Sequence, residues 1–378
     1  MDEPSRAAPA TAPAPSAAVK WAAYLGVPLV LALVLTLIAE GVVRARQWSR
    51  LGTASSFTDL YRTDPAMDLR VLVPGARVGR IAVNSAGFRG PEITQPKPDG
   101  ALRIAFLGAS TTFCAEVSSN DEVWPQLVTE DLRRRFPGAL IDFVNAGVPG
   151  YTVESMRKIL RHRVAALKPD LIVVYEATNE LSAEVRRRAL AEKVIDSPVA
   201  HHPGWLERHS LLWELVVKNM RVRSAQAQPS TSGMRKLTVD PSSLGGSFRT
   251  DLSALLREAR ATGAHVAVVT FATHLRPGQS EEQSRRAAVS ALVYMPFMTI
   301  DGLLAGYARY NDVIREVART EGATLIGGED SVPGDPQHFA DSVHFNDAGS
   351  RAQARRVADA LAGDPAVQAL LSARQRRP

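Results

Sequence analysis

The sequence predicts an open α/β domain that follows an N-terminal transmembrane helix. Short apolar runs, of the kind that form buried strands, alternate with stretches long enough for helices. Strands separated in this way indicate right-handed crossovers and a parallel sheet with helices on both faces. A long apolar segment near the N-terminus indicates the membrane helix.

The N-terminal segment divides into two parts. Residues 1–20 carry a proline- and alanine-rich run, which indicates a disordered tail. Residues 21–43 are apolar except for Thr36 and Glu40, and a helix of about 23 residues spans about 34 Å, enough for a hydrocarbon core of about 30 Å. We expect a retained single-pass membrane anchor over residues 21–43. A cleaved signal peptide is the alternative, although no clear A-x-A site follows the apolar core.

The α/β domain is expected over residues 101–364. Residues 44–100 precede it as an irregular lead-in with a short hairpin around residues 71–83, and residues 365–378 follow it as a C-terminal tail. Residues 180–245 interrupt the alternation and are expected to form an insertion between the third and fourth strands. The five strands are expected at residues 103–107, 140–145, 171–175, 265–271 and 323–326.

Helices are expected between these strands and at the end of the domain. Ser119 and Glu122 have the spacing of a capping box ahead of the first helix, and Thr152 is a candidate N-cap for the second. The helices are expected near residues 124–136, 153–167, 248–261, 303–321 and 347–361.

Composition excludes several functional classes. The formal net charge is +6, but the basic residues are scattered as short runs such as residues 133–135, without zinc-finger spacing or RNP-like aromatic motifs. We therefore expect solvated helix faces and no nucleic-acid partner. The single cysteine, Cys114, excludes an intrachain disulfide and a cysteine-built metal site. No H-E-x-x-H motif, G-x-G-x-x-G motif or P-loop is present, and we expect neither a metal nor a cofactor.

Residues suited to acyl transfer follow the predicted strands. Ligands of open parallel sheets bind beyond the carboxyl ends of the strands. Ser110 follows the first strand, Gly150 the second and Asn179 the third, and Asp341 and His344 precede the last helix. A serine hydroxyl becomes a nucleophile when a base such as His344 removes its proton, and Asp341 can orient that imidazole. The backbone N–H groups of Ser110 and Gly150 and the side-chain amide of Asn179 can form an oxyanion hole.

Some neighbouring residues compete with these candidates. Gly147 lies close enough to Gly150 to be the oxyanion glycine instead. His338 is expected to be a loop histidine without a catalytic role, and Glu176 and Glu180 are expected to be solvated loop acids.

These motifs resemble the four sequence blocks of the SGNH or GDSL hydrolases, a family named for Ser, Gly, Asn and His. The matching segments are Gly108-Ala109-Ser110, the run "NAGVPGYT" that ends at Thr152, Ala177-Thr178-Asn179-Glu180 and Asp341-Ser342-Val343-His344. The lead-in run "NSAGFRG" also resembles bacterial members that carry an N-terminal membrane segment. Two positions depart from the family pattern, because Ala109 replaces the usual aspartate and Ala177 a glycine.

The resemblance covers residues 80–364 and implies a flavodoxin-like three-layer αβα sandwich with esterase, lipase or carbohydrate-deacetylase activity and no cofactor. We therefore expect a membrane-anchored serine esterase whose catalytic domain is extracytoplasmic and whose substrate is a small-molecule, lipid or glycan ester. Two alternatives remain open. One is an O-acyltransferase that passes the acyl group to an envelope glycan, and the other is an SGNH-like binding domain without activity.

Overall fold

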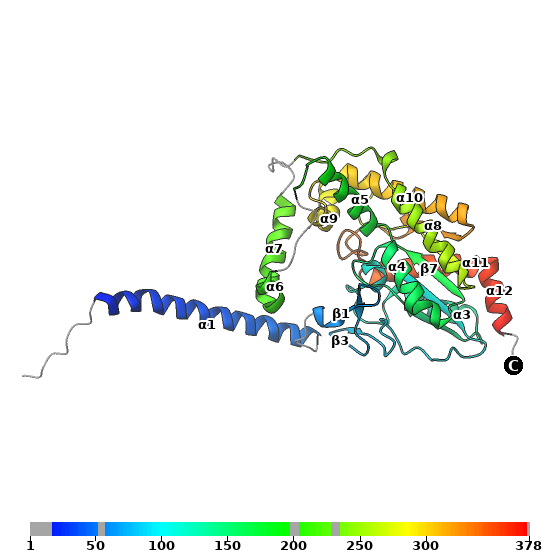
Figure 1. The fold of residues 1–378 in the computed structure, drawn as a ribbon, viewed down its shortest axis with the longest axis horizontal. Helices are drawn as coiled ribbons and strands as arrows, with labels where there is room; N and C mark the ends of the chain where they lie inside the picture. The colour runs from blue at the N-terminus through cyan, green and yellow to red at the C-terminus, as the bar shows by residue number, and fades with distance from the viewer. Residues whose placement is uncertain (1–16, 52–56, 197–203, 228–234, 376–378) are drawn as a thin grey trace, which may run out of the picture.

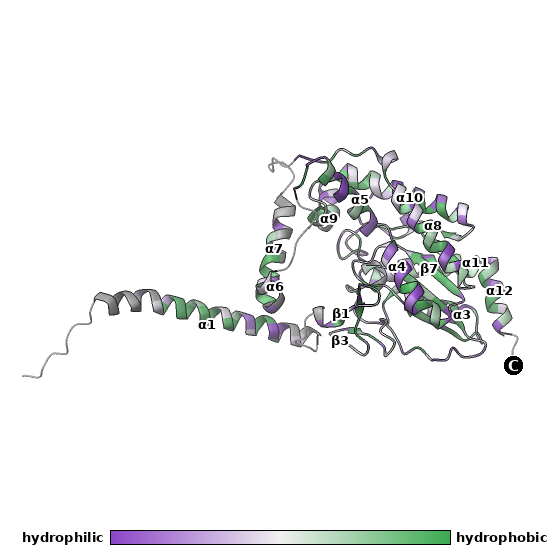
Figure 2. Ribbon diagram, viewed as in Figure 1, coloured by the Kyte–Doolittle hydropathy of each residue, from purple (hydrophilic) through white to green (hydrophobic). Residues whose placement is uncertain are grey.

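The computed structural model describes residues 17–51, 57–196, 204–227 and 235–375, and most of the expected N-terminal tail lies outside them. A long helix, α1 (Ala17–Leu51), extends away from the α/β domain, which begins beyond its C-terminal end (Figure 1). Within α1, the segment Gly26–Arg46 has a mean hydropathy of 2.3 and none of it is buried. In Figure 2, which colours the ribbon by residue hydropathy, much of this segment has the green of hydrophobic residues. This segment is long and apolar enough to cross a membrane, a property that a signal sequence shares.

The centre of the domain is a five-stranded parallel sheet in the order β6-β5-β7-β8-β9. All five expected strands are confirmed. The side chains of β5 and β7 are entirely buried, whereas the edge strand β9 is partly exposed. The sheet has the strand order of flavodoxin-like folds, which confirms the predicted fold class. The strands are β5 (Leu102–Gly108), β6 (Ile141–Asn145), β7 (Leu171–Tyr175), β8 (His265–Val269) and β9 (Thr324–Ile326).

Helices cover both faces of this sheet, as the alternation predicts (Figure 1). On one side α3 packs against α11, and on the other α8 packs against α4 and α10. The helices are α3 (Trp124–Arg135), α4 (Val153–Ile159), α8 (Gly246–Ala261), α10 (Ile300–Glu321), α11 (Asp347–Gly363) and α12 (Pro365–Gln375). A single turn of π-helix and a 3-10 turn extend α4 to Leu167, so the expected helical stretch is continuous.

Two helix ends differ in how well the sequence predicts them. Thr152 caps α4, since its side chain accepts a hydrogen bond from the Ser155 amide at 3.4 Å. The prediction of a capping box at Ser119 and Glu122 is wrong. The Ser119 hydroxyl accepts from the Asp121 amide, and the Glu122 carboxylate pairs with Arg351 instead.

Two helices were not expected. The C-terminal segment carries α12, which packs against the beginning of β5. Another helix, α9 (Glu281–Tyr294), lies between β8 and α10. It begins with a capping box, in which the Ser280 side chain accepts from the Gln283 amide and the Gln283 side chain accepts from the Ser280 amide. The spacing of Ser280 and Gln283 was the signal in the sequence that could have predicted it.

The lead-in and the insertion both have secondary structure of their own. The lead-in forms two antiparallel pairs, β1 (Tyr61–Asp64) with β2 (Leu69–Leu72) and β3 (Arg77–Val78) with β4 (Ile81–Ala82). Its buried side chains belong to the same hydrophobic cluster as the sheet. The insertion forms α5 (Thr178–Ala191), α6 (Trp205–His209) and α7 (Leu211–Ala227).

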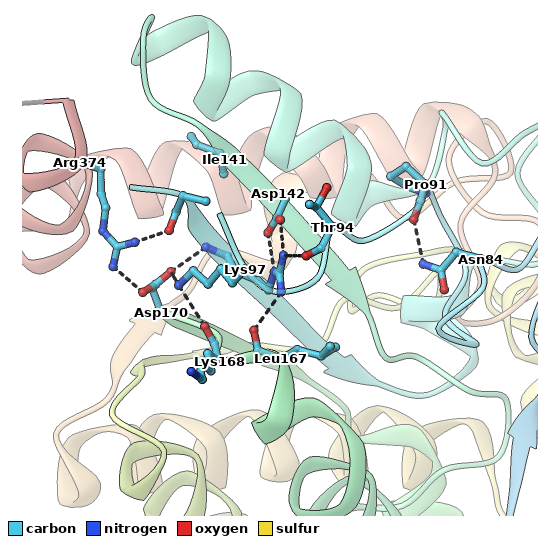
Figure 3. A network of polar contacts seen from close by, with 12 residues as sticks. Asn84, Pro91, Thr94, Lys97, Ile141, Asp142, Leu167, Lys168, Asp170 and Arg374 are labelled. Atoms are coloured by element: carbon cyan, nitrogen blue, oxygen red, sulfur yellow. Dashed lines mark hydrogen bonds and ion pairs between the residues drawn. The ribbon is translucent and has the colours of Figure 1, made fainter. Parts of the chain in front are cut away.

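A network of ion pairs closes the amino-terminal edge of the sheet (Figure 3). The buried guanidinium of Arg103, on β5, makes two hydrogen bonds to the Asp142 carboxylate, at 2.8 and 2.6 Å. The Asp170 carboxylate, just before β7, accepts from Lys97, from Arg374 and from the Arg103 amide. These bonds tie the lead-in and α12 to the first and third strands.

Candidate active site

The turn after β5 presents Ser110 at the carboxyl-terminal edge of the sheet. The strand ends at Gly108, and α2 (Ser110–Phe113) begins directly after the buried Ala109. A Cβ at position 108 would lie 2.0 Å from the Thr112 Oγ1 atom and 2.8 Å from the Tyr175 carbonyl oxygen. The close approach of these groups requires glycine there, which explains why the apolar strand stops so abruptly.

A hydrogen-bonded chain joins Ser110 to two residues from the loop before α11. The His344 Nε2 atom lies 2.8 Å from the Ser110 Oγ atom, and the His344 Nδ1 atom lies 2.8 Å from an oxygen of Asp341. The other Asp341 oxygen accepts from the Val343 and His344 amides, both at 2.9 Å. The three predicted residues therefore lie together, and the loop backbone fixes the Asp341 carboxylate.

The electrostatic environment of His344 favours the charged form of its imidazole. Burial by itself would lower the pKa of His344, but the hydrogen bond to Asp341 and the charges of Glu116 and Glu176 raise it to about 9. Burial would likewise raise the pKa of Asp341, and the hydrogen bond and charge of His344 hold it below its usual value. The deprotonated imidazole is the form that can accept the proton of the serine hydroxyl, and the raised pKa makes that form a stronger base.

The glycine and amide predicted for an oxyanion hole lie in the same cavity as Ser110. Gly150 has a φ of +86°, a backbone conformation that favours glycine. The Asn179 Nδ2 atom donates to the Tyr151 carbonyl at 2.9 Å, which leaves its second amide hydrogen for another acceptor. Both residues line a cavity of about 410 Å³ together with Ser110, Asp341 and His344.

Gly147, the alternative to Gly150 as the oxyanion glycine, has a different structural role. Its amide donates to the Asn145 side chain at 3.0 Å. A Cβ at position 147 would lie 2.6 Å from the Phe113 nitrogen, so glycine is needed there for close packing against α2. The Gly147 amide is therefore already used, whereas Gly150 lines the cavity.

The cavity is also lined by residues from segments that the sequence analysis did not connect with the site. The lead-in supplies Phe57 and Arg70, and α9 supplies Ser290 and Tyr294. An Arg70 amino group donates to the Pro149 carbonyl at 2.5 Å and so holds the loop of Gly150. The lead-in thus shapes the site as well as preceding the domain.

Arg89 of the lead-in supports the turn that carries Ser110. Its buried guanidinium donates to the carbonyls of Phe113 and Cys114, at 2.7 and 2.5 Å, which are the last carbonyls of α2. It also donates to the Asn120 side chain at 2.9 Å. A cation at the C-terminus of a helix satisfies its free carbonyls, so Arg89 stabilises the short helix that begins with the serine.

Two acids around the site, Glu176 and Glu180, are buried and a third, Glu116, is half-buried, so the expectation of solvated loop acids at Glu176 and Glu180 is wrong. Glu180 accepts from the Val153 amide at 2.6 Å, at the start of α4. The Glu176 carboxylate accepts from the backbone N–H of Asn179 at 2.7 Å, and burial raises the pKa of Glu176 to about 8. Glu116, which was not predicted, lines the cavity, and burial raises its pKa as well. Within the part of the chain that the structure describes, one oxygen of Glu116 and one of Glu176 lack a hydrogen-bond partner.

A second Asp-x-x-His pair lies close by in the sequence. The His338 Nδ1 atom lies 2.7 Å from an oxygen of Asp335, in the same local arrangement as His344 and Asp341. The cavity with Ser110 is lined by His344 and not by His338. Three-dimensional placement therefore separates two pairs that the sequence pattern makes equivalent.

Among residues 17–51, 57–196, 204–227 and 235–375, which the structure describes, no group of three His, Cys, Asp or Glu side chains could hold a metal ion. The single cysteine, Cys114, is buried, and burial raises the pKa of its thiol to about 12.

Comparison with known proteins identifies the family to which this sequence is similar. A model of the GDSL-like lipase/acylhydrolase family matches residues 106–352. Among solved structures, the lipase/acylhydrolase from Enterococcus faecalis is similar at 17% sequence identity and a TM-score of 0.41, with 69% of this chain and 96% of that chain covered. The acetyl xylan esterase AlAXEase is similar at 15% identity and a TM-score of 0.40, with 68% and 99% covered. A variant of Axe2, an acetyl xylan esterase from Geobacillus stearothermophilus, is similar at 15% identity and 0.41, with 68% and 94% covered. No curated protein matches the chain.

The matched segment takes in more than half of the 378 residues. It runs from within β5 to the first turns of α11, and so includes all three residues of the hydrogen-bonded chain. The chain belongs to the GDSL-like lipase/acylhydrolase family and is an SGNH-type hydrolase.

Proposed function

We propose that this protein is a membrane-anchored serine esterase that hydrolyses acyl or acetyl esters with Ser110, His344 and Asp341 as its catalytic triad. The Ser110 Oγ atom attacks the ester carbonyl while His344 takes the hydroxyl proton. The tetrahedral intermediate collapses to an acyl-enzyme, and His344 returns the proton to the leaving alcohol. Water, deprotonated by the same imidazole, then attacks the acyl-enzyme and releases the carboxylic acid.

The observation that carries this proposal is the continuous chain from Ser110 through His344 to Asp341, with both hydrogen bonds at 2.8 Å. Asp341 fixes the tautomer and orientation of the imidazole and stabilises its charged form. No other described serine that lines the cavity has a hydrogen bond to a histidine ring.

For the oxyanion hole we propose the amides of Ser110 and Gly150 and the side chain of Asn179. The positive φ of Gly150 and the contact of Arg70 with Pro149 support a fixed position for this loop. Preorganised donors of this kind stabilise the charge that develops on the carbonyl oxygen, and each is worth about 3 kcal/mol of the barrier.

The membrane anchor in this proposal is α1, through its apolar segment Gly26–Arg46. An anchor of this kind would hold the catalytic domain at a bilayer, with the domain on the extracytoplasmic side. A reporter enzyme that is active on one side of the membrane, fused to the C-terminus, tests the orientation. Activity of a cytoplasmic reporter would contradict the proposed side.

Turnover of short p-nitrophenyl esters by the full-length protein in detergent micelles tests the esterase activity. We expect hydrolysis by the parent protein, loss of hydrolysis in His344→Ala, and retention in the matched control His338→Ala, which removes the imidazole of the other Asp-x-x-His pair. Equal turnover by parent and His344→Ala would contradict the proposal. Adding a sugar acceptor to the same assay distinguishes hydrolysis from acyl transfer, since transfer would place the acyl group on the sugar.

A further inference from the structure

The insertion carries a helical segment, α6–α7, whose apolar side chains are exposed to solvent. Trp205 and Leu206 on α6 are 66% and 51% exposed. On α7 the side chains of Trp213, Val216 and Met220 are exposed at helical spacing and form a stripe, and Leu215 is exposed on another side of the helix. Exposed apolar surface of this extent indicates a partner or a membrane.

The start of α7 is bound to the apolar segment of α1 by Glu40. The Glu40 carboxylate accepts from the Ser210 hydroxyl at 2.8 Å and from the amides of Leu211 and Leu212 at 3.1 and 2.9 Å. It also pairs with Arg44, one helical turn further along α1, at 2.8 Å. The Glu40 side chain is 17% exposed as a result. A carboxylate at a helix N-terminus stabilises that helix, so Glu40 caps α7.

The depth of Glu40 in the apolar segment determines where α7 begins. Glu40 precedes the end of that segment, Arg46, by six residues, which corresponds to about 9 Å of helix. Helices that lie in the membrane interface bury their apolar face to about 5–10 Å in the headgroup and acyl boundary. Glu40 therefore holds the start of α7 at interfacial depth if α1 crosses the bilayer.

The direction of α7 agrees with this depth. In Figure 1, α7 runs crosswise to α1 and leads from α6, beside α1, toward α9. A helix that lies crosswise to a membrane-spanning helix runs along the bilayer plane. Its apolar stripe can then face the acyl chains over its whole length.

We propose that α6–α7 lies in the interface of the bilayer that α1 crosses and forms a second membrane contact of the catalytic domain. This inference depends on the membrane anchor of the proposed function. Helix α7 also packs on α9, whose residues Ser290 and Tyr294 line the catalytic cavity. The contact thereby fixes the cavity close to the lipid surface, where amphiphilic esters are concentrated.

Single-cysteine labelling of the full-length protein in lipid nanodiscs tests the contact. The native Cys114 is buried, and the unsubstituted protein gives its background. A fluorescent maleimide is attached at Met220→Cys on α7, at Leu33→Cys on α1, and at Leu325→Cys on β9, where the native leucine is 40% exposed. Doxyl groups quench probes near them, so lipids with a shallow doxyl group report on Met220→Cys and lipids with a deep doxyl group report on Leu33→Cys.

We expect strong quenching at Met220→Cys and Leu33→Cys and none at Leu325→Cys. Quenching at Leu33→Cys with none at Met220→Cys would overturn the inference and leave the anchor intact. Absence of quenching at Leu33→Cys would overturn the anchor, and the inference with it, whereas ester turnover measures the catalytic proposal separately. Oxidative crosslinking of two Met220→Cys chains without quenching would overturn the inference in favour of a second copy as the partner.

The substitution Glu40→Ala tests how the helix is held. It removes the acceptors for Ser210, Leu211 and Leu212, so we expect quenching at Met220→Cys to fall severalfold while quenching at Leu33→Cys stays unchanged. Glu40→Gln keeps one acceptor oxygen and should retain most of the quenching. Unchanged quenching at Met220→Cys in Glu40→Ala would overturn the role of Glu40 in holding α7.

Discussion

The charged groups at the two edges of the central sheet differ in how fully they are hydrogen-bonded. At the amino-terminal edge, the Asp170 carboxylate binds Lys97, Arg374 and a backbone amide, and Arg103 is paired with Asp142 (Figure 3). At the carboxyl-terminal edge, Glu116 and Glu176 each keep one oxygen without a hydrogen bond to any described residue.

This difference indicates that the amino-terminal edge contributes mainly to stability and the carboxyl-terminal edge mainly to the site. Buried polar groups are satisfied in most of a folded protein, and unsatisfied ones concentrate where the protein binds or reacts. The amino-terminal edge holds three segments of the chain together. The carboxyl-terminal edge carries Ser110 and His344, and Glu116 lines the cavity with them. We therefore expect substitutions at the two edges to affect different properties.

The largest effect on stability is expected at the amino-terminal edge. Arg103→Met leaves the Asp142 carboxylate without the buried guanidinium that makes two hydrogen bonds to it. Loss of one partner of a buried ion pair costs about 3–5 kcal/mol, so the free energy of unfolding should fall by that amount in denaturant titration. The turnover of the folded fraction should remain close to that of the parent. A large loss of turnover without a loss of stability would show that the two edges are not separate in this way.

The complementary substitution at the carboxyl-terminal edge is Asn179→Ala. It removes an amide proposed for the oxyanion hole, and we expect kcat to fall about 100-fold, equivalent to about 3 kcal/mol. The hydrogen bond from Asn179 to the Tyr151 carbonyl is lost as well, so the free energy of unfolding should fall by about 1 kcal/mol. Steady-state kinetics and denaturant titration measure both quantities. An unchanged kcat would remove Asn179 from the oxyanion hole.

A pH-dependent effect on stability is expected for Glu176→Gln. Burial raises the pKa of Glu176 to about 8, above its value in the unfolded chain, so the folded protein holds this proton more tightly. The resulting stability is fully present below the unfolded pKa of about 4.3 and is lost as pH rises through about 8. The parent should therefore lose stability relative to Glu176→Gln across this range in denaturant titrations. Parallel curves for the two proteins would contradict the raised pKa.

The smallest effect is expected for Glu116→Gln. The charge of Glu116 contributes to the raised pKa of His344, so a neutral side chain should lower that pKa. The base is active when deprotonated, and the acidic limb of kcat/KM should therefore move to lower pH, by less than about one unit. Glu92→Gln, at an exposed carboxylate that bonds to Ser85, is the matched control and should leave the limb in place. An unchanged limb in Glu116→Gln would show that this charge does not act on the base.

The sequence predicts the sheet and much of the site because the relevant signals are local. Each strand is a short apolar run, and Ser110 and Asn179 follow such runs directly. The contacts of Arg89 and Arg70 with the loops around the cavity could not be predicted in this way. Arg89 reaches the Phe113 carbonyl across 24 positions, and Arg70 reaches Pro149 across 79.

Local patterns also fail where they occur twice. Asp335 with His338 and Asp341 with His344 have the same spacing and the same internal hydrogen bond. Only the folding of the loop against α2 brings one imidazole to Ser110. Burial gives another example, because Glu176 occurs in a polar run but is buried in the folded chain.

The most direct test of the catalytic proposal is covalent labelling of Ser110 by a fluorophosphonate, followed by peptide mass spectrometry. We expect a single adduct on Ser110 in the parent, none in Ser110→Ala, and labelling in His344→Ala slowed by about 10⁴-fold or more. Labelling of another residue, or an equal rate in His344→Ala, would contradict the assignment of Ser110 as the nucleophile that His344 activates.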